Sequence, residues 1–398
     1  MTSVHTPGYE RWFTAIPLRY SEEGSFWVRD AGLVALGMRS LGIDAQFVAR
    51  GEGTGPKDRP LILATLAQMG DAAWWRQWKL EGVALYAWGV PRYTPIARAI
   101  KTAGCKLALV LDNDGVVSPR VWASRYLVRQ YYVEAEERPR LLAAILAAAK
   151  TALAAIPARH AGRVQHLELA DAMVLPSPLA KERFCRFLES QGRTDLIKKV
   201  HFAPYAVVPE MTWQPGMKRE RAIIAVGRWQ TVVKNAPLLV AALARALKAR
   251  PAWRARVLGN GGDIVKRLIA ATPGADALAI EVPGAVPHDR LPDFYRKSAI
   301  MLTTSFYESF HIASAEALCC GCSVVGDARI PSMPYMAGSV SGTVYSIPTT
   351  GNVADALLTE MDSWDSGDRN PDHIGAWWTA RLHPDRVAER ILSTVREY

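Results

Sequence analysis

Short apolar runs alternate with segments of helical periodicity along most of the chain. Runs of strand length that are bounded by turn or polar residues are typical of buried strands. In the first half, the predicted strands are Trp12–Ile16, Ala45–Ala49, Leu61–Ala64, Val83–Ala87, Leu107–Leu111, Ala172–Leu175 and Val200–Ala203. In the second half, they are Ala222–Val226, Ala255–Leu258, Ile300–Leu302, Ser323–Val325 and Val344–Ile347. Strands that alternate with helices predict parallel sheets.

The segments between these runs carry helical patterns. Apolar residues from Phe26 to Leu41 recur at helical spacing after a candidate cap at Ser25. A predicted last helix begins at Pro384, because proline suits the first turn of a helix.

Two domains are expected, because 398 residues exceed the usual size of one hydrophobic core. Prolines, a glycine and a basic run at residues 209–221 predict a linker. The sequence thus predicts an α/β fold with two Rossmann-like, doubly wound parallel-sheet domains facing a cleft. We expect them at residues 1–208 and 222–376, with a C-terminal helix at residues 377–398 that crosses back to the first domain.

A net charge of +10 predicts anionic partners. No zinc-finger spacing, aromatic RNP-type strand or heptad-linked basic region occurs, so nucleic-acid binding is not expected. The first residues lack a secretory pattern and no run is apolar enough to span a bilayer, which predicts a cytoplasmic location. Residues 122–140 interleave aromatic and basic side chains. Two interpretations stay open for them: an ordinary packed helix, or peripheral contact with the inner face of a membrane.

The five cysteines are an odd number, which argues against a disulfide framework and predicts free thiols. Cys319, Cys320 and Cys322 lie close together but lack paired ligand spacing and a nearby histidine. We interpret them as small buried side chains rather than metal ligands.

The most informative segment runs from Ile300 to Gly326 and reads as a strand, a loop, a helix and another strand. A helix that starts near Ser309 or Phe310 leaves backbone N–H groups free there, and such groups bind phosphate. Glu308 lies just before this start, so its carboxylate suits the hydroxyl groups of a sugar better than an anion. Glu316 lies about two turns further on and is a candidate to accept hydrogen bonds from a ribose.

Two cations follow the predicted strand Ala222–Val226, namely Arg228 and Lys234. Ligands of open α/β sheets bind at the carboxyl ends of the strands. Both cations are therefore candidates to neutralise a diphosphate.

These residues resemble a known family. The string ESFHIASAE from Glu308 to Glu316, followed by ALCCGCSVVG, resembles the E-x7-E signature of glycosyltransferase family 4. Arg228 and Lys234 resemble the diphosphate clamp of that family. Residues 256–262 resemble the next strand and turn of the family, and residues 283–288 resemble its loop on the side of the base. The resemblance is strong over residues 170–398 and faint before them.

The resemblance implies the GT-B fold, a nucleotide-sugar donor, retention of anomeric configuration, and no metal or other cofactor. It also implies that residues 1–208 form the acceptor-side domain and residues 222–376 the domain that binds the nucleotide sugar. By motif position, Arg228 and Lys234 hold the diphosphate and Glu308 orients the donor sugar. The remaining donor-binding candidates are Glu316 for the ribose, the amides of Phe310 and His311 for a phosphate oxygen, and Ser309 at the expected helix start. Gly24 in a reduced glycine loop, and Gly284 and Val286 in the base-side loop, complete the set.

The sequence also departs from the family pattern. The separation of Arg228 and Lys234 is one residue longer than the common form, and His311 stands where a glycine is frequent. A histidine that often follows an N-terminal strand is missing, since Leu107–Leu111 is followed by Asp112-Asn113-Asp114. Asp112 and Asp114 are candidates for the acceptor side. They also fit a short D-x-D metal pattern, which we disfavour because strand ends favour aspartate for turn reasons.

The sequence therefore predicts a retaining glycosyltransferase that moves a hexose-type unit from a nucleoside diphosphate sugar to a hydroxyl group. The acceptor class stays open among glycans, lipid-linked sugars and small molecules. A non-catalytic nucleotide-sugar-binding or scaffolding protein of the same fold is the alternative.

Overall fold

The computed structural model describes residues 10–20, 30–53, 59–87, 91–111 and 160–396, together with residues 115, 141, 142, 145, 146, 148 and 149. The chain divides into two compact units. The first comprises the described residues up to 115, residues 160–208 and residues 382–396. The second comprises residues 209–381 and the described residues between 141 and 149. Residues 209–221, where a linker is predicted, contain no helix or strand.

The first unit is built on a parallel sheet that has seven strands among the described residues, in the order β3-β2-β1-β4-β5-β6-β7. Every predicted strand of this half is confirmed to within a few residues. The strands are β1 (Arg11–Arg19), β2 (Asp44–Arg50), β3 (Leu61–Ala64), β4 (Gly82–Tyr86), β5 (Lys106–Val110), β6 (Ala172–Leu175) and β7 (Val200–Phe202).

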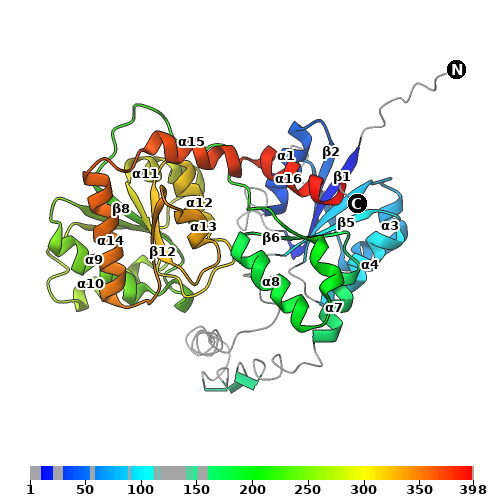
Figure 1. Ribbon diagram of the computed structural model, residues 1–398, viewed down its shortest axis with the longest axis horizontal. Coiled ribbons are helices and arrows are strands. Elements are labelled where there is room, and N and C mark those ends of the chain that lie inside the picture. The colour runs from blue at the N-terminus through cyan, green and yellow to red at the C-terminus, as the bar shows by residue number, and fades with distance from the viewer. Residues whose placement is uncertain are drawn as a thin grey trace. The chain divides into compact units, whose positions relative to one another are not determined.

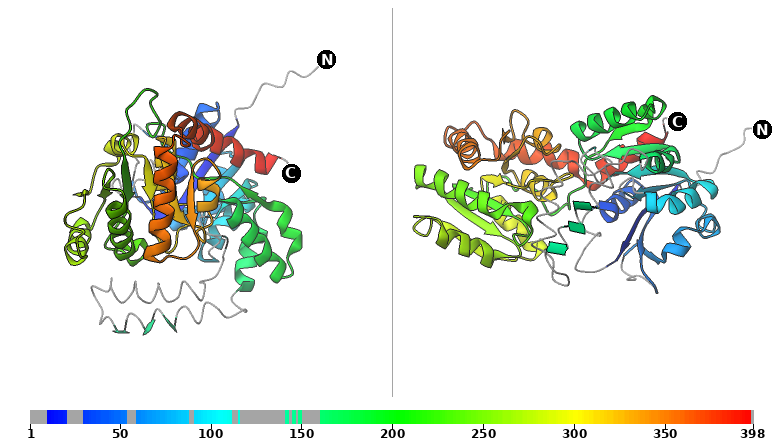
Figure 2. Two further views of the ribbon diagram at one scale, coloured as in Figure 1. Left: turned by 60° about the vertical axis from the view of Figure 1, so that its left-hand side comes forward. Right: turned by 90° about the horizontal axis from the view of Figure 1, so that it is seen from below.

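Helices connect these strands, as Figures 1 and 2 show. They are α1 (Asp30–Ser40), α2 (Leu66–Met69), α3 (Ala72–Arg76), α4 (Thr94–Thr102), α7 (His160–Glu168) and α8 (Pro178–Ser190). The predicted cap of α1 at Ser25 lies outside the described residues.

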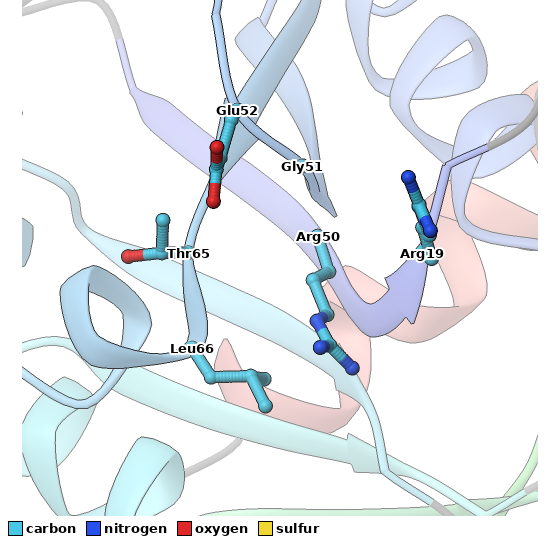
Figure 3. A pocket seen from close by; sticks show the side chains of 6 residues that line it. All are labelled: Arg19, Arg50, Gly51, Glu52, Thr65 and Leu66. Atoms are coloured by element: carbon cyan, nitrogen blue, oxygen red, sulfur yellow. The ribbon is translucent and has the colours of Figure 1, made fainter.

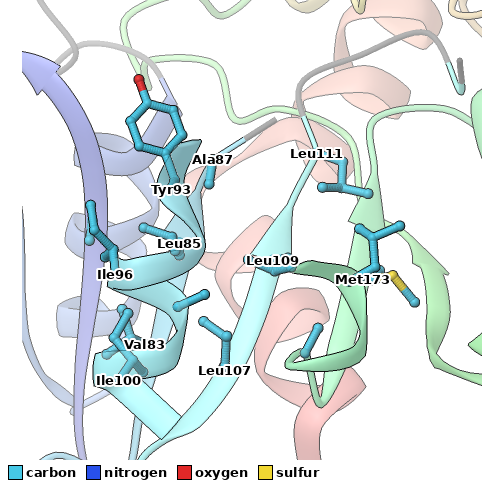
Figure 4. Packing of buried hydrophobic residues seen from close by; sticks show 14 of the residues in the cluster. Val83, Leu85, Ala87, Tyr93, Ile96, Ile100, Leu107, Leu109, Leu111 and Met173 are labelled. Atoms are coloured by element: carbon cyan, nitrogen blue, oxygen red, sulfur yellow. The ribbon is translucent and has the colours of Figure 1, made fainter. Parts of the chain in front are cut away.

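One hydrophobic cluster of the first unit lies on one face of the sheet, against α4, α7 and α8 (Figure 4). Alternate residues of neighbouring strands meet there, since Val83 pairs with Leu107 and Leu85 pairs with Leu109 in register. All four side chains are fully buried. Strand residues that alternate in this way bury one set on each face of the sheet, so the pattern fixes the register.

The chain returns to this unit in its last helix, α16 (Pro384–Arg396), which packs on α1. Gly37 of α1 makes this contact possible, because a Cβ at that position would lie 2.2 Å from the carbonyl oxygen of Pro384. Residues 371–382 form a separate helix, α15 (Pro371–Leu382). The predicted boundary at residue 377 therefore falls inside a helix.

The second unit is built on a parallel sheet with the order β10-β9-β8-β11-β12-β13. Its described strands are β8 (Ala222–Val226), β9 (Arg254–Leu258), β10 (Ile280–Gly284), β11 (Ile300–Leu302), β12 (Ser323–Asp327) and β13 (Gly342–Tyr345). Two parallel, helix-covered sheets confirm the predicted fold class.

Two strands of this sheet differ from the prediction. β10 was missed because it is an edge strand that carries Glu281 and Pro283 instead of an apolar run, and an edge tolerates a proline. β13 begins two residues before the predicted strand. Gly342 pairs with Val324, and a Cβ on Gly342 would lie 2.1 Å from the Val324 carbonyl oxygen, so only glycine fits this part of the ladder.

Helices cover both faces of the second sheet (Figure 1). α9 (Ala236–Ala249) packs against α10 (Gly262–Ala271) and α14 (Thr350–Asp365). On the other face, α12 (Ile312–Cys319) packs against α11 (Leu291–Lys297) and α13 (Met333–Ala337). Within the described part of the chain, no helix combines the length and the apolar character needed to cross a membrane.

Candidate functional site

The carboxyl ends of three strands of the second sheet are joined by backbone hydrogen bonds. Gly227, directly after β8, donates its N–H to Leu258 of β9 at 3.1 Å, and Gly259 donates to Gly284 of β10 at 2.8 Å. Trp229 donates to the carbonyl oxygen of Asn260 at 2.7 Å. The loops that follow these strands therefore form one connected rim at the edge where open α/β sheets bind their ligands.

Gly259 makes this rim compact. Its φ is +118°, and a Cβ on it would lie 1.9 Å from the carbonyl oxygen of Gly227. An L-residue there would meet both an unfavourable backbone conformation and a steric clash. The rim thus depends on glycine at this position.

The loop after β8 is joined to the loop after β11, as expected for neighbouring strands. Phe306 donates its N–H to Val233 at 2.9 Å, and the Thr304 hydroxyl donates to the carbonyl oxygen of Lys234 at 3.0 Å. These bonds place the Lys234 Nζ atom 2.6 Å from the Oε1 atom of Glu308. Two predicted site residues that are 74 positions apart are therefore in direct contact.

The Lys234–Glu308 pair is mostly buried, with side chains 18% and 19% exposed. Burial alone raises the pKa of the Glu308 carboxyl, but the Lys234 ammonium and the hydrogen bonds to Lys234 and Ser305 outweigh it and leave the pKa below its usual value. Glu308 is consequently ionised at neutral pH.

Arg228 lies beyond the end of β8 and is exposed. Its backbone carbonyl accepts hydrogen bonds from the N–H and the hydroxyl of Thr231, which fix the turn. The guanidinium itself makes no hydrogen bond or ion pair with residues that the structure describes. It is therefore available to an anion from solution.

The helix after Glu308 starts later than expected. α12 begins at Ile312 with His311 as its N-cap, so a start near Ser309 or Phe310 is wrong. The reason is that the His311 side chain accepts a hydrogen bond from the N–H of Ser314, three residues on, which caps the helix at this point. Ser309 lies in the preceding loop, so Ser309 and Glu316 do not share a helix face.

His311 has a left-handed backbone with φ +69° and is buried. Its Nδ1 atom lies 2.7 Å from the Ser314 hydroxyl and its Nε2 atom 3.1 Å from the Thr303 hydroxyl. Burial first, and the nearby Lys234 charge second, lower the pKa of His311 to about 4. The imidazole is thus neutral and caps the helix, in a conformation that a glycine adopts with less strain.

Glu316 lies within α12 and is 6% exposed. Its Oε1 atom is 2.8 Å from His288 Nε2, and its Oε2 atom accepts a hydrogen bond from the Tyr295 hydroxyl at 3.2 Å. Burial raises the pKa of Tyr295 well above its ordinary value, so the hydroxyl keeps its proton and is the donor in this hydrogen bond. Each carboxylate oxygen still has a lone pair for a further donor.

His288 connects Glu316 to the predicted base-side loop. Gly284 is the last residue of β10 and has φ +87°, and Val286 follows it, half-buried. The sequence pointed to Glu316 and to this loop, but not to their contact. A histidine and a tyrosine can be matched to a carboxylate only when strand order is known, so no signal in the chain identified His288 and Tyr295 as its partners.

Other predicted residues lie elsewhere. Gly24, Asp112 and Asp114 are outside the described residues, as is the 122–140 segment.

All five cysteines are free, which confirms the prediction of free thiols. Burial raises the pKa of Cys322 to about 11, so it stays a thiol, and it donates to the carbonyl oxygens of Tyr295 and Ser298. Among the described residues, no cluster of histidine, cysteine, aspartate and glutamate is suited to hold a metal ion.

Residues 220–361, which contain this site, match the family model of the glycosyl transferases group 1. Two curated relatives are proteins named D-inositol 3-phosphate glycosyltransferase. The one from Segniliparus rotundus is 32% identical over 130 residues, which are 31% of this chain and 28% of the relative. The one from Rhodococcus opacus is 34% identical over 152 residues, which are 36% of this chain and 31% of the relative. The chain thus matches about a third of the length of these relatives.

Solved structures are similar to the whole chain. HepE from Anabaena, in complex with UDP and glucose, matches with a TM-score of 0.63 at 14% identity. The match covers 98% of this chain and 100% of the HepE chain. Sucrose-phosphate synthase from Thermosynechococcus elongatus matches with a TM-score of 0.62 at 13% identity. The match covers 98% of this chain and 99% of the synthase chain. The chain therefore has the GT-B fold of glycosyltransferases, and its residues 220–361 are similar to the glycosyl transferases group 1.

Proposed function

We propose that this protein is a retaining glycosyltransferase that transfers a hexose unit from a nucleoside diphosphate sugar to a hydroxyl acceptor without a metal ion. The observation that carries the proposal is the 2.6 Å contact between Lys234 and Glu308 at the carboxyl edge of the second sheet. It brings the predicted diphosphate-binding and sugar-binding residues together. The match of residues 220–361 to a glycosyltransferase family supports the same activity.

In this proposal the donor diphosphate binds between Arg228 and Lys234. Arg228 is free to contact it, whereas Lys234 is held by Glu308 in the structure. A diphosphate carries more negative charge than one carboxylate, so it competes for the lysine. Glu308 then turns its carboxylate toward the sugar. The sugar hydroxyl groups donate hydrogen bonds to this carboxylate.

Transfer breaks the bond between the anomeric carbon and the diphosphate, and the acceptor oxygen forms the new bond to that carbon. The proton of the acceptor hydroxyl passes to an oxygen of the departing diphosphate. Negative charge grows on the departing diphosphate. Arg228 and Lys234 stabilise this charge, and removal of such a contact from a site of this kind costs about 100-fold to 1,000-fold in rate. The neutral His311 adds no charge but fixes the start of α12 beside the site.

Glu316 is proposed to hold the donor ribose. Tyr295 and His288 orient its carboxylate, which leaves lone pairs for the two ribose hydroxyl groups. The segment from Gly284 to Val286 is proposed to lie against the base, because His288 ties this segment to Glu316. A cytoplasmic location and membrane contact stay predictions from the sequence.

The experiment that tests the function is a thermal-shift screen of the full chain with the diphosphates of uridine, guanosine, adenosine and cytidine. A ligand that binds only the folded state raises the melting temperature by mass action. One nucleotide should raise it for the wild-type protein and much less for Arg228→Gln. If no nucleotide shifts the melting temperature, the proposal is wrong.

The preferred nucleotide then defines the donor for a turnover assay. NMR of the product should show the anomeric configuration of the donor, and addition of EDTA should leave the rate unchanged. Inverted product would exclude retention, and loss of activity with EDTA would exclude metal independence. Binding without any turnover would favour a non-catalytic protein.

A further inference from the structure

A pocket of about 480 Å³ lies within the first unit, at the carboxyl ends of β1, β2 and β3. Its volume is within the range of small-molecule sites, roughly 300–1,000 Å³. The lining residues are Arg19, Arg50, Gly51, Glu52, Thr65 and Leu66. This is the edge of an open α/β sheet where ligands bind, and no predicted donor-binding residue among those described lines it.

Two arginines are brought together here by the register of the sheet. Arg19 and Arg50 are the last residues of β1 and β2 and are partners across the parallel pair. Tyr20 donates its N–H to the carbonyl oxygen of Arg50 at 2.8 Å, which fixes this alignment. Neighbouring strands lie roughly 4.8 Å apart, so two positive charges start from adjacent backbone positions. Like charges placed opposite each other destabilise a sheet.

Among the described residues, no partner offsets this repulsion. Both arginines are exposed, and neither makes a hydrogen bond or ion pair with any residue in the described ranges. Glu52 lines the same pocket without forming an ion pair to either of them among the described residues. The other two cations at described strand ends of this sheet do have partners, since Arg11 pairs with Asp44 and Lys106 with Glu81.

Figure 3 shows how the side chains lie around the pocket. Arg19 and Arg50 extend from neighbouring strand ends with their guanidinium groups in different directions, and Glu52 and Thr65 lie on the other side of Arg50 from Arg19. Long, unconstrained arginine side chains can turn toward one anion, and their planar donor groups match phosphate and carboxylate. Leu66 adds an apolar wall and is 39% exposed.

We propose that this pocket binds the acceptor and that the acceptor carries a phosphate or carboxylate group, which Arg19 and Arg50 hold. The inference rests on the proposed function, since it names the acceptor class of that reaction. Glu52 and the backbone at Gly51 face the uncharged part of the acceptor, where a carboxylate accepts hydrogen bonds from hydroxyl groups. The two arginines thus select for charge and Glu52 for hydroxyl groups.

The test measures binding of matched acceptor pairs to the full chain, in the presence of the nucleotide found in the thermal-shift screen. The pairs are glucose and glucose 6-phosphate, inositol and inositol phosphate, and glucose and glucuronate. The wild-type protein should bind at least one anionic member about 100-fold more tightly than its neutral counterpart, because two charge-assisted contacts are each worth about a tenfold change. If no anionic member binds better than its neutral partner, the inference is wrong.

Variants assign the effect to the two arginines. Arg19→Gln with Arg50→Gln should abolish the preference for the anionic member, whereas Arg19→Lys with Arg50→Lys should keep part of it. The matched control is Arg98→Gln, an exposed arginine of α4 in the same unit, and it should bind as the wild type does. A double glutamine variant that keeps the preference would overturn the inference.

Two further measurements separate the possible outcomes. Nucleotide binding should be the same in the wild type, the two double variants and Arg98→Gln. If the wild type binds no nucleotide, the proposed function is wrong. If it binds nucleotide but shows no preference for an anionic acceptor, only the acceptor inference is wrong. Sedimentation with phosphatidylglycerol and phosphatidylcholine vesicles distinguishes a lipid headgroup from a soluble anion. Binding to phosphatidylglycerol alone, lost in the double glutamine variant, would assign the anion to a lipid.

Discussion

The carboxyl edges of the two sheets share a topology but differ in how their charges are arranged. At the edge of the second sheet, Lys234 is held by Glu308 and the strand ends are joined through Gly227 and Gly259. At the edge of the first sheet, Arg19 and Arg50 lie side by side without such a partner among the described residues. The fold places a binding edge in each unit, and the side chains there decide what each edge can bind.

This comparison predicts different consequences for the two edges. The second edge is held together internally, so a substitution there affects folding as well as chemistry. The side chains of the first-edge arginines form no hydrogen bond or ion pair with described residues, so their substitution should affect ligand binding alone. The following changes test that difference, from the largest expected effect to the smallest.

The largest effect is expected for Lys234→Ala, which removes one of the two cations from the proposed diphosphate site. The turnover number should fall by about 100-fold to 1,000-fold, because charge on the leaving group loses a fixed partner. Glu308→Ala should also lower turnover, with a smaller change in nucleotide binding. Steady-state kinetics measures both. The variant of the first edge that combines Arg19→Gln with Arg50→Gln serves as the contrast. Unchanged turnover in Lys234→Ala would show that this residue takes no part in the mechanism.

A smaller effect is expected for Gly259→Ala. The added Cβ would lie 1.9 Å from the Gly227 carbonyl oxygen at a backbone φ of +118°, so the strand ends must move apart. We expect a loss of about 3 kcal/mol in the free energy of unfolding, from strain and clash together. Denaturant titration measures it.

Gly274→Ala is the control for this substitution. Gly274 also has a positive φ, +73°, but a Cβ there meets nothing within 4 Å. Its cost should be only the strain of the left-handed backbone, about 1 kcal/mol. Equal losses in the two variants would show that the contact of Gly259 with Gly227 is unimportant.

The smallest effect concerns pH and one buried histidine in each unit. Burial lowers the pKa of His166 to about 4, and burial with Lys234 lowers that of His311 to about 4 as well. The unfolded chain therefore binds protons near pH 6.5 that the folded chain refuses, so stability falls as the pH falls from 6.5 toward 4. Each histidine should cost about 2 kcal/mol between about pH 7 and about pH 5.

Asparagine variants separate the two contributions. His311→Asn keeps a side chain that caps helices and tolerates a left-handed backbone, and it removes the titrating group. It should flatten the pH dependence of the unfolding of the second unit, and His166→Asn that of the first. Denaturant titrations across this pH range give the slopes. A wild-type slope that persists in both variants would contradict the assignment.

Much of the fold could be predicted from the pattern of the chain. Buried parallel strands appear as continuous apolar runs, which is why β6, β8 and β11 were predicted at their observed bounds. β3 is a partly buried edge strand, and it was predicted because all four of its residues are apolar. The edge strand β10 lacks that signal, because it carries Glu281 and Pro283. The sequence pattern therefore identifies strands that are runs of apolar residues, and it misses a strand that carries charged residues and proline.

The candidate site was predicted in its members but not in its contacts. Glu308, Glu316, Arg228 and Lys234 stand out by type and position, yet their roles stay predictions. The start of α12 was placed too early because His311 acts as the cap, and a histidine is not among the usual capping residues. The match of Glu316 to His288 and Tyr295 depends on strands and helices that are distant in the chain.

By itself, the sequence determined most of the segments that form strands, that the chain folds into two parallel-sheet units, and which residue types stand at the ends of those strands. Periodicity and local turn chemistry are short-range properties, so they can be read along one chain. Only the tertiary structure decided that Lys234 contacts Glu308 and that Arg19 lies beside Arg50. These contacts depend on strand order and register, which are set by how the buried faces pack together.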